Sequence, residues 1–251
     1  MKIAVCVKAV PSAATGARLD PETLRLDRSG DLALSEYDTH AVEEALRLRS
    51  EDGEVVVVSL GPERAADALR KALAMGADRA VLISDRSFEG ADLLVTAGAL
   101  AAALAREHAE LVLFGQQSPD GNGACLWAAV ADRLRLPVVS QVAELVVEGG
   151  AVRGKRQTEV GYETLRAPLP AVVAVSDAIN EPRYPSLKGI MGAKSKPQEA
   201  LSAAAVGGAS EPATRVVGLF PPPARGESRR IEDDGTAAEA IVDFLTEKRL
   251  L

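Results

Sequence analysis

The stretch of this chain best suited to holding a ligand is residues 115–125, Gly-Gln-Gln-Ser-Pro-Asp-Gly-Asn-Gly-Ala-Cys, which follows an apolar run. Gly121 and Gly123 permit a ligand to approach the backbone closely, and Asp120 and Asn122 are residue types that cap helices. Backbone N–H groups at the start of the helix expected next suit an anion such as a nucleotide phosphate. The stretch matches neither a Walker loop nor a GxGxxG fingerprint, so an ordinary capped turn is the alternative.

Side chains capable of acid–base, nucleophilic or metal chemistry are few and scattered. His40 and His108 lie in expected helices, and neither accompanies a nucleophile motif. Cys6 and Cys125 provide neither a disulfide framework nor a metal cluster. We therefore expect no catalytic residue and no metal site, and a structural role for His40 in preference to a nucleotide contact.

A second unusual segment, residues 180–194, follows the apolar run at 171–175 and reads Asn-Glu-Pro-Arg-Tyr-Pro-Ser-Leu-Lys-Gly-Ile-Met-Gly-Ala-Lys. Its proline and glycine content disfavours a long helix. It nevertheless carries four large apolar side chains, Tyr184, Leu187, Ile190 and Met191. Apolar groups on stiff turns just past a buried strand suit the docking of another protein. The alternative is a loop that packs on its own core.

Several motifs, in the right order, resemble the beta subunit of electron transfer flavoproteins. Segment 180–194 is similar to the signature of that family. Residues 5–11, Val-Cys-Val-Lys-Ala-Val-Pro, resemble its first strand and the Lys-x-Val-Pro turn that follows. Residues 41–46, Ala-Val-Glu-Glu-Ala-Leu, and 73–78, Leu-Ala-Met-Gly-Ala-Asp, resemble its first two helices. The resemblance therefore covers nearly all of the chain.

This resemblance implies a fold and a function. The fold is an α/β open parallel sheet with helices on both faces, like that of adenine nucleotide alpha hydrolases. The function is to carry electrons, as one half of a heterodimer with an alpha subunit, from flavin dehydrogenases of fatty acid or amine oxidation to a membrane quinone reductase or another acceptor. The redox chemistry belongs to an FAD shared with the alpha subunit. The chain is thus expected to be a carrier subunit and not an enzyme.

The resemblance also implies a nucleotide pocket, which holds AMP or, in electron-bifurcating members, a second FAD. The corresponding positions are Ala9 and Leu60 for adenine, Ser35 where relatives commonly have Asn, and Asp120, Asn122, Gly123, Ala124 and Cys125 for phosphate. Relatives often have Asp-Gly-Asp-Thr-Ala-Gln where this chain has Asp-Gly-Asn-Gly-Ala-Cys. Main-chain N–H groups remain, but fewer side chains assist. We therefore expect AMP in preference to a second FAD, whose pyrophosphate needs more donors.

In the same family context, segment 180–196 is the partner-recognition segment. Leu187 is the expected anchor that enters a pocket of the dehydrogenase, and Tyr184, Ile190 and Met191 support it. A small apolar anchor suits a transient complex that must release quickly.

Elements of alternating type must position these segments. Apolar runs predict buried strands at 2–7, 54–60, 79–83, 111–114 and 170–175, and helical spacing predicts helices at 37–50, 63–75, 91–108 and 122–134. Strands that alternate with helices predict a parallel sheet. Ligands of such sheets bind beyond the carboxyl ends of the strands, where the loops 8–11, 59–62 and 115–125 begin. Residues 16–34 are expected to form a small hairpin excursion.

The domain organisation follows from changes in composition. Residues 1–196 are expected to form the nucleotide-binding domain, with an antiparallel hairpin annex at about 138–168, where polar and apolar residues alternate. Residues 197–251 contain a linker rich in Ala, Gly, Ser and Pro, followed by an amphipathic helix at 236–248. We expect an arm that packs on the alpha subunit, as in similar beta subunits. The alternative is an arm that folds back on its own domain.

Bulk composition excludes several classes of protein. The 251 residues are 47% hydrophobic and 26% charged, which is typical of a globular protein. A net charge of −7 and an aromatic content of 3% disfavour nucleic acid as a partner. The sequence shows no signal-peptide pattern and no apolar run of the length that spans a bilayer. We expect a cytoplasmic protein without direct membrane insertion.

Two other functions remain open from the residues alone. One is a flavin-free adenine-nucleotide sensor or hydrolase on the same fold, because fold alone does not define function. The other is a scaffold that has lost its nucleotide, which Gly123 and Cys125 make conceivable. Under the first of these alternatives, segment 180–194 and the C-terminal helix lack a purpose.

Overall fold

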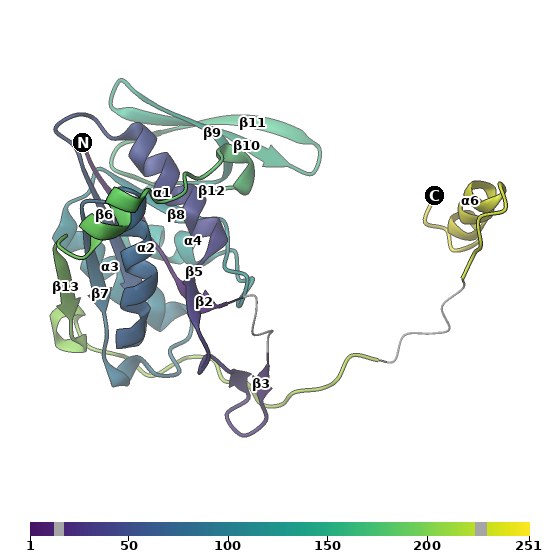
Figure 1. Ribbon diagram of the computed structural model, residues 1–251, viewed down its shortest axis with the longest axis horizontal. Helices are drawn as coiled ribbons and strands as arrows, with labels where there is room; N and C mark the ends of the chain where they lie inside the picture. The colour runs from purple at the N-terminus through teal and green to yellow at the C-terminus, as the bar shows by residue number, and fades with distance from the viewer. Residues whose placement is uncertain (13–17, 224–229) are drawn as a thin grey trace. The chain divides into compact units, whose positions relative to one another are not determined.

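The computed structural model describes residues 1–12, 18–223 and 230–251. Within these residues, the largest sheet has nine strands in the order β11-β10-β9-β12-β8-β1-β6-β7-β13 (Figure 1). The pairs from β9 to β13 are parallel, and the pairs β9–β10 and β10–β11 are antiparallel. The predicted α/β fold with a mainly parallel sheet is confirmed.

The parallel strands are continuous apolar runs because both of their faces are covered. They are β1 (Lys2–Cys6), β6 (Glu54–Leu60), β7 (Arg79–Ile83), β8 (Leu111–Gly115), β9 (Val138–Glu148), β12 (Ala171–Val175) and β13 (Gln198–Leu201). The predicted ranges 54–60 and 79–83 agree with the structure to the residue. Val55 to Val58, at the centre of β6, are fully buried.

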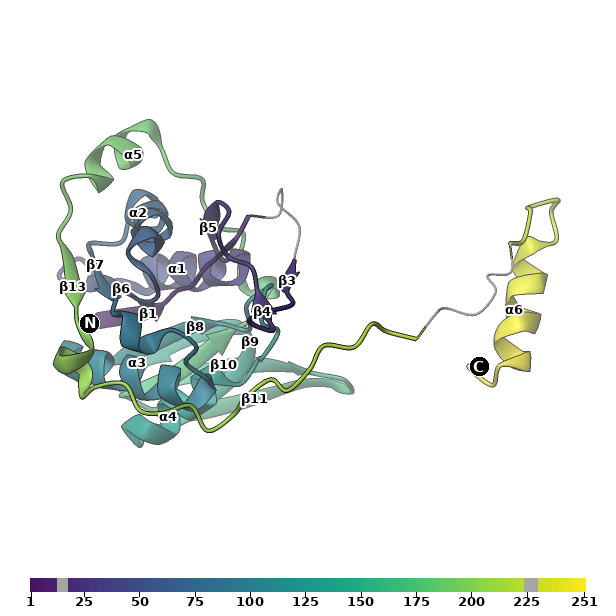
Figure 2. The ribbon, with the colours of Figure 1, turned by 90° about the horizontal axis from the view of Figure 1, so that it is seen from below.

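Helices cover both faces of the sheet (Figure 2). One face carries α1 (Glu36–Leu48), α2 (Ala66–Met75) and α5 (Leu187–Ala193), and the other carries α3 (Leu93–Glu107) and α4 (Leu126–Leu134). Alternate residues of β1 therefore enter separate cores. Ile3 and Val5 pack with the first set of helices, whereas Ala4 and Cys6 pack with the second.

The helix ends show how local sequence sets the elements. Helix α2 ends at Gly76, whose φ of 138° suits glycine, as its sequence predicts. Helix α4 begins at Leu126, and the prediction that it begins at residue 122 is wrong. Asn122 and Ala124 have left-handed backbones, with φ of 47° and 44°, which a right-handed helix does not admit. The Gly-rich stretch is therefore longer than expected.

The hairpin annex is continuous with the main sheet. The first residues of β9 pair in parallel with β12, and its last residues pair with β10 (Ala151–Thr158), which pairs in turn with β11 (Gly161–Pro168). Gly149 and Gly150 connect β9 to β10 with φ of 56° and 71°, as a two-residue type I′ turn requires.

The excursion between β1 and α1 contains two small antiparallel sheets. Strand β2 (Ala9–Pro11) pairs with β5 (Leu32–Leu34), and β3 (Leu19–Asp20) pairs with β4 (Arg25–Leu26). Residues 16 and 17 of the expected excursion lie outside the described residues.

The chain divides into two units, residues 1–217 and 218–251, so the boundary expected at 196/197 is wrong. Strand β13 adds to the edge of the sheet beside β7, and the short 3-10 helix at Ala203–Val206 buries Val206 in the α3 core. These contacts hold the beginning of the expected linker in the first unit. The second unit contains α6 (Ala237–Glu247), and residues 224–229 of the linker lie outside the described residues.

Among the described residues there are three further short 3-10 helices, namely Glu63–Ala65, Arg86–Phe88 and Asp177–Ile179. In the part of the chain that the structure describes, no helix combines the length and the hydropathy needed to cross a bilayer.

Candidate nucleotide site and docking surface

The order of the strands identifies the edge of the sheet where a ligand is expected. From β1 the chain proceeds to β6 and β7 on one side, and later to β8 and β12 on the other. The switch in strand order therefore lies between β1 and β8. Ligands of open α/β sheets bind at such a point, outside the carboxyl ends of the strands. The loops that leave β1, β6 and β8 all begin at this edge, as predicted.

A buried carboxyl group joins the ends of β1 and β8. Asp38, in the first turn of α1, accepts a hydrogen bond of 2.8 Å at Oδ2 from the backbone N–H of Lys8. Its Oδ1 lies so close to Gly115 that a Cβ there would be only 2.6 Å away. Burial raises the pKa of Asp38 to about 7, although the hydrogen bond from Lys8 acts in the opposite direction.

The Gly-rich stretch forms a turn with free donors. The N–H of Asn122 donates to the carbonyl of Ser118 at 2.8 Å, and the indole N–H of Trp127 donates to the carbonyl of Gln116 at 3.1 Å. Among the described residues, the backbone N–H groups from 123 to 127 donate to no protein acceptor. Consecutive free N–H groups on a backbone that alternates in handedness form a concave anion site.

Asp120 is the charged centre of this turn, and its interpretation as a helix cap is wrong. Its carboxylate accepts hydrogen bonds from Lys8 Nζ at 2.8 Å and from Arg28 Nη2 at 2.7 Å. Its side chain is only 4% exposed. Burial acts to raise the pKa of Asp120, but the hydrogen bonds and charges of Lys8 and Arg28 outweigh it and lower the pKa below its ordinary value. The cluster of two cations and one anion has a net charge of +1.

The other predicted nucleotide positions lie around the same edge. Ala9 begins β2 and Leu60 ends β6, and both are half-buried. Asn122, Gly123 and Cys125 are exposed on the turn, and Ala124 is half-buried.

Ser35 differs from the other predicted positions because it lies beneath the surface. Its side chain is fully buried, and its N–H donates to the Lys8 carbonyl at 3.0 Å. The hydroxyl therefore lies under the loop, where a ligand does not reach it without a rearrangement.

These residues fit a nucleotide phosphate. Free N–H groups would donate to the phosphate oxygens, and the net positive charge of the Lys8, Asp120 and Arg28 cluster favours an anion. Most of these donors are backbone N–H groups. They are therefore still present although Gly123 and Cys125 replace the side chains that are usual in the family.

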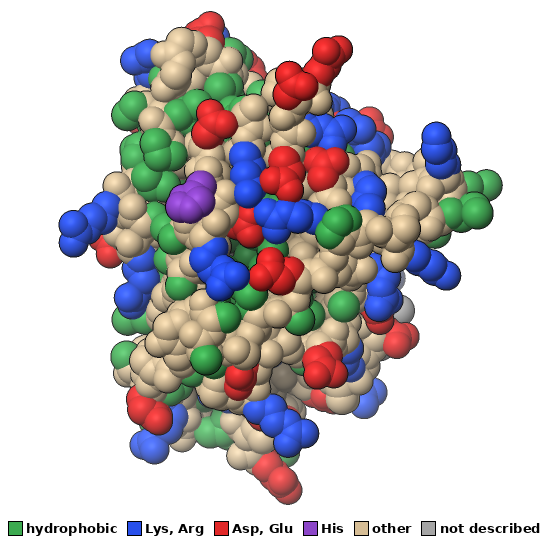
Figure 3. All heavy atoms as spheres, turned by 90° about the vertical axis from the view of Figure 1, so that its left-hand side faces the viewer, with side chains coloured by type: hydrophobic (Ala, Val, Ile, Leu, Met, Phe, Trp, Pro, Cys, Tyr) green, Lys and Arg blue, Asp and Glu red, His purple; other side chains and the backbone are tan. Residues whose placement is uncertain are grey.

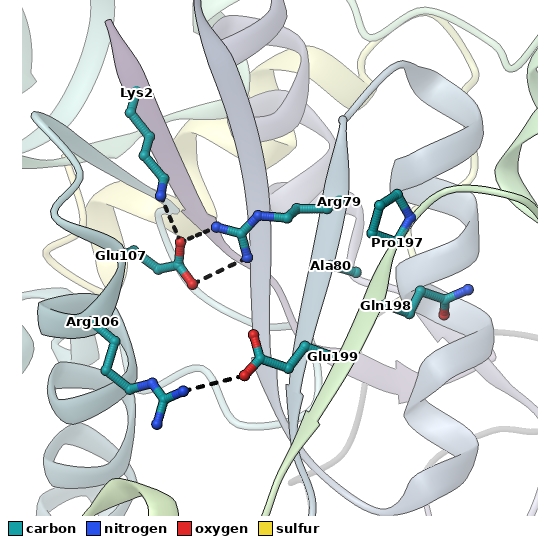
Figure 4. Close-up of a pocket in the computed structure, with 8 residues that line it drawn as sticks. All are labelled: Lys2, Arg79, Ala80, Arg106, Glu107, Pro197, Gln198 and Glu199. Atoms are coloured by element: carbon teal, nitrogen blue, oxygen red, sulfur yellow. Dashed lines mark hydrogen bonds and ion pairs between the residues drawn. The ribbon is translucent and has the colours of Figure 1, made fainter.

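A different cleft, of about 370 Å³, lies at the opposite ends of the strands (Figure 4). Its charges neutralise one another. Glu107 and the neighbouring Glu54 bind Lys2 and Arg79, and Arg106 binds Glu199 at 3.2 Å. We interpret it as a clamp that fixes β13 to the sheet. On the molecular face in Figure 3, basic and acidic side chains are interspersed in the same manner.

Polar contacts fasten the beginning of segment 180–194 to α1. The side chain of Asn180 donates to the His40 carbonyl and to Glu44, each at 3.0 Å. Arg183 donates to Glu43, whose side chain is 4% exposed and also accepts from Arg47. Burial acts to raise the pKa of Glu43, but these arginines outweigh it and lower the pKa. The imidazole Nδ1 of His40 lies 3.0 Å from the Asn180 carbonyl oxygen, which agrees with the structural role expected for this histidine.

The rest of the segment folds into α5 and packs against α2. Gly189 lies so close to α2 that a Cβ there would collide with the carbonyl oxygen of Ala74. The ammonium group of Lys196 donates to the carbonyl of Leu73 at 2.9 Å and also to that of Ala77. Four apolar side chains of the segment are nevertheless 94%, 82%, 50% and 77% exposed, namely Tyr184, Leu187, Ile190 and Met191.

Sequence reasoning missed three residues of these two sites. Asp38 and Glu43 interrupt the apolar face of α1, so a polar residue at a helical core position was an available signal. Arg28 gave no local signal, because its partner is 92 residues away.

Known proteins resemble this chain over nearly its whole length. A family model described as "Electron transfer flavoprotein domain" matches residues 23–206. The "Electron transfer flavoprotein subunit beta" of Mycobacterium leprae is 40% identical over 263 residues, with 99% of both chains covered. The protein of the same name from Megasphaera elsdenii is 37% identical over 266 residues, which cover 99% of this chain and 97% of the relative.

A third relative carries a different name. The "Caffeyl-CoA reductase-Etf complex subunit CarD" of Acetobacterium woodii is 37% identical over 264 residues, with 100% of both chains covered. Together with the sheet and the two surfaces described above, these matches confirm the resemblance of the sequence motifs. The chain belongs to the electron transfer flavoprotein family, in the group of its beta subunits.

Proposed function

We propose that this chain pairs with an alpha subunit and carries electrons in the cytoplasm from flavin dehydrogenases to a membrane quinone reductase or another acceptor. The proposal extends the family membership to named classes of partner. FAD shared with the alpha subunit would supply the electron-accepting and electron-donating chemistry. The residues of this chain position partners and nucleotide, and none is assigned a catalytic role.

AMP is the nucleotide proposed for the site at the carboxyl ends of β1, β6 and β8. The free N–H groups from 123 to 127 and the positive cluster around Asp120 support a phosphate there. Ala9 and Leu60 are proposed to contact adenine through main-chain groups. A second FAD is the less favoured occupant, because its second phosphate needs further donors.

The docking surface is the observation that carries the proposal. Leu187 and Met191 are exposed on α5, where Gly189 lies close against α2. Arg183, which precedes this helix, is bound to Glu43 of α1. Because these contacts already hold the backbone of the segment in place, little further conformational entropy is lost when its exposed apolar side chains bind a partner. We propose that Leu187 enters a pocket of the dehydrogenase, with Tyr184, Ile190 and Met191 around it.

Replacement of the anchor tests this proposal. Leu187→Ala is expected to lower kcat/KM for reduction of the heterodimer by its dehydrogenase about tenfold, because truncation of an anchor side chain costs more than about 1 kcal/mol. Flavin content should not change. Leu94→Ala, at an exposed leucine of α3, is the matched control. An unchanged rate for Leu187→Ala would remove the anchor from the proposal.

Co-expression with the alpha subunit tests the wider assignment. A yellow complex that contains both subunits is expected, with AMP released on denaturation. A colourless single chain that turns over adenine nucleotide would instead favour the flavin-free alternative and contradict the proposal.

A further inference from the structure

The excursion formed by residues 18–34 contacts all three loops that leave the carboxyl ends of the strands. The pairing of β2 with β5 joins it to the loop after β1. Arg64, in the 3-10 helix Glu63–Ala65 that directly follows the loop after β6, donates to the carbonyls of Ser29 and Gly30 at 2.9 and 3.0 Å. Arg28 joins the excursion to the turn after β8 through Asp120. The excursion therefore spans the edge at which the nucleotide is proposed to bind.

The contact of Arg28 with Asp120 is the most specific of these three. Both Nε and Nη2 donate to Asp120 Oδ2, at 3.0 and 2.7 Å, while Lys8 holds Oδ1. Arg28 is 41% exposed and the Asp120 side chain 4%, so the carboxylate is shielded from water. Charge-assisted hydrogen bonds from a planar guanidinium fix the orientation of a carboxylate as well as its charge.

The turn needs such external support. Ala124 has a positive φ of 44° and the helix begins only at Leu126, so local hydrogen bonds do not hold the residues in between. A non-glycine residue keeps a left-handed backbone only where its surroundings impose it. Lys8 alone would neutralise Asp120, and Arg28 adds the second point of attachment and the surplus positive charge.

We propose that Arg28 is a positioning residue for the nucleotide site. Through Asp120 it holds the turn in the conformation that presents the N–H groups of residues 123–127 to one phosphate. The identity of the phosphate ligand, AMP, rests on the proposed function, whereas the attachment of the turn does not.

AMP binding to the nucleotide-free heterodimer tests the role of Arg28. Arg28→Ala is expected to weaken AMP binding about tenfold, and Arg28→Lys to restore part of the affinity. Asp120→Asn should weaken it at least as much, because it also removes the charge that Lys8 pairs with. The double variant should lose little more than Asp120→Asn alone, because the contact of Arg28 with Asp120 is then already broken. Arg64→Ala is the matched control, since it loosens the same excursion without touching the turn. Arg64→Ala should change the AMP dissociation constant less than twofold, which is about the error with which the effects of independent mutations add.

Alkylation of Cys125 gives a second measurement that does not depend on nucleotide. Cys125 is exposed on the turn, whereas Cys6 is buried and serves as the internal reference. In the nucleotide-free heterodimer, mass spectrometry should show a different alkylation rate at Cys125 in Arg28→Ala, and an unchanged rate in Arg64→Ala. Thermal unfolding identifies any variant that fails to fold.

The outcomes separate the two proposals. Wild-type heterodimer that does not bind AMP would contradict the nucleotide part of the proposed function. Wild-type AMP binding that Arg28→Ala leaves intact, or equal losses in Arg28→Ala and Arg64→Ala, would overturn the positioning role alone. An unchanged Cys125 alkylation rate in Arg28→Ala would overturn it as well.

Discussion

Asp38 shows how one residue can connect two loops of a site. Its carboxyl group lies between the backbone of Lys8 and that of Gly115, at the ends of the two strands where the order of the sheet reverses. Larger side chains at position 115 would collide with it. The group is buried, so its charged form is disfavoured and its pKa is raised to about 7.

The raised pKa predicts a stability change with pH. Between pH 5 and 7 the folded protein keeps a proton on Asp38 that the unfolded chain has lost, so this group lowers the free energy of unfolding as pH rises. Relative to Asp38→Asn, the wild type should lose about 2 kcal/mol of stability between pH 5 and pH 7. Urea unfolding of both proteins at the two pH values measures the difference. Parallel pH profiles would show that Asp38 ionises in the folded protein at its ordinary pKa.

At the scale of elements, α5 is a short helix that depends on its neighbours. Isolated helices of this length are unstable in water, so packing against α2 must hold it. Gly189 permits that packing because it has no Cβ to collide with the Ala74 carbonyl. Ser186 caps the helix by accepting a hydrogen bond of 3.0 Å from the Gly189 N–H.

Two glycines of this helix allow a matched comparison. Gly189→Ala is expected to lower the free energy of unfolding by about 1–3 kcal/mol, because the added methyl group overpacks the contact with α2. Gly192→Ala adds the same methyl group where no atom lies within 4 Å, and should leave stability unchanged or raise it by up to about 1 kcal/mol. Urea denaturation measures both. Equal effects of the two changes would contradict the close approach of α5 to α2.

At the scale of the whole molecule, the chain consists of two units with different apolar content. All the buried hydrophobic residues of the described chain lie in the first unit, within residues 1–217. The second unit instead leaves large apolar side chains exposed, namely Leu219, Phe220, Ile241, Val242, Leu250 and Leu251. Exposed apolar groups of this number indicate an interaction surface. We propose that they pack on the alpha subunit.

Removal of residues 218–251 tests that proposal. The shortened chain should give the far-UV circular dichroism spectrum of a folded α/β protein and should unfold cooperatively, because all the buried hydrophobic residues described above lie within it. It should no longer co-purify with the alpha subunit under conditions in which the full chain does. Equal recovery of the alpha subunit with both chains would show that the second unit is not needed for assembly.

The prediction from sequence was accurate where the physical signal is local. Buried parallel strands are continuous apolar runs, so 54–60 and 79–83 were placed to the residue. Gly76 ended α2 as expected, because a positive φ favours glycine. The family motifs and the loops at the carboxyl ends of the strands were likewise evident from residue types in order along the chain, whereas the docking role of segment 180–194 stays a proposal.

Only the tertiary structure decided the features that join distant segments. The sequence of β13 is mostly exposed and weakly apolar, and its place in the sheet comes from pairing with β7. Asp120 resembles a cap by its position before a helix, but its partners lie 112 and 92 residues away. Ser35 is buried because α1 packs under the loop after β1. Contacts of long sequence separation leave no periodic pattern, and so the charge cluster and its support by Arg28 required the folded chain.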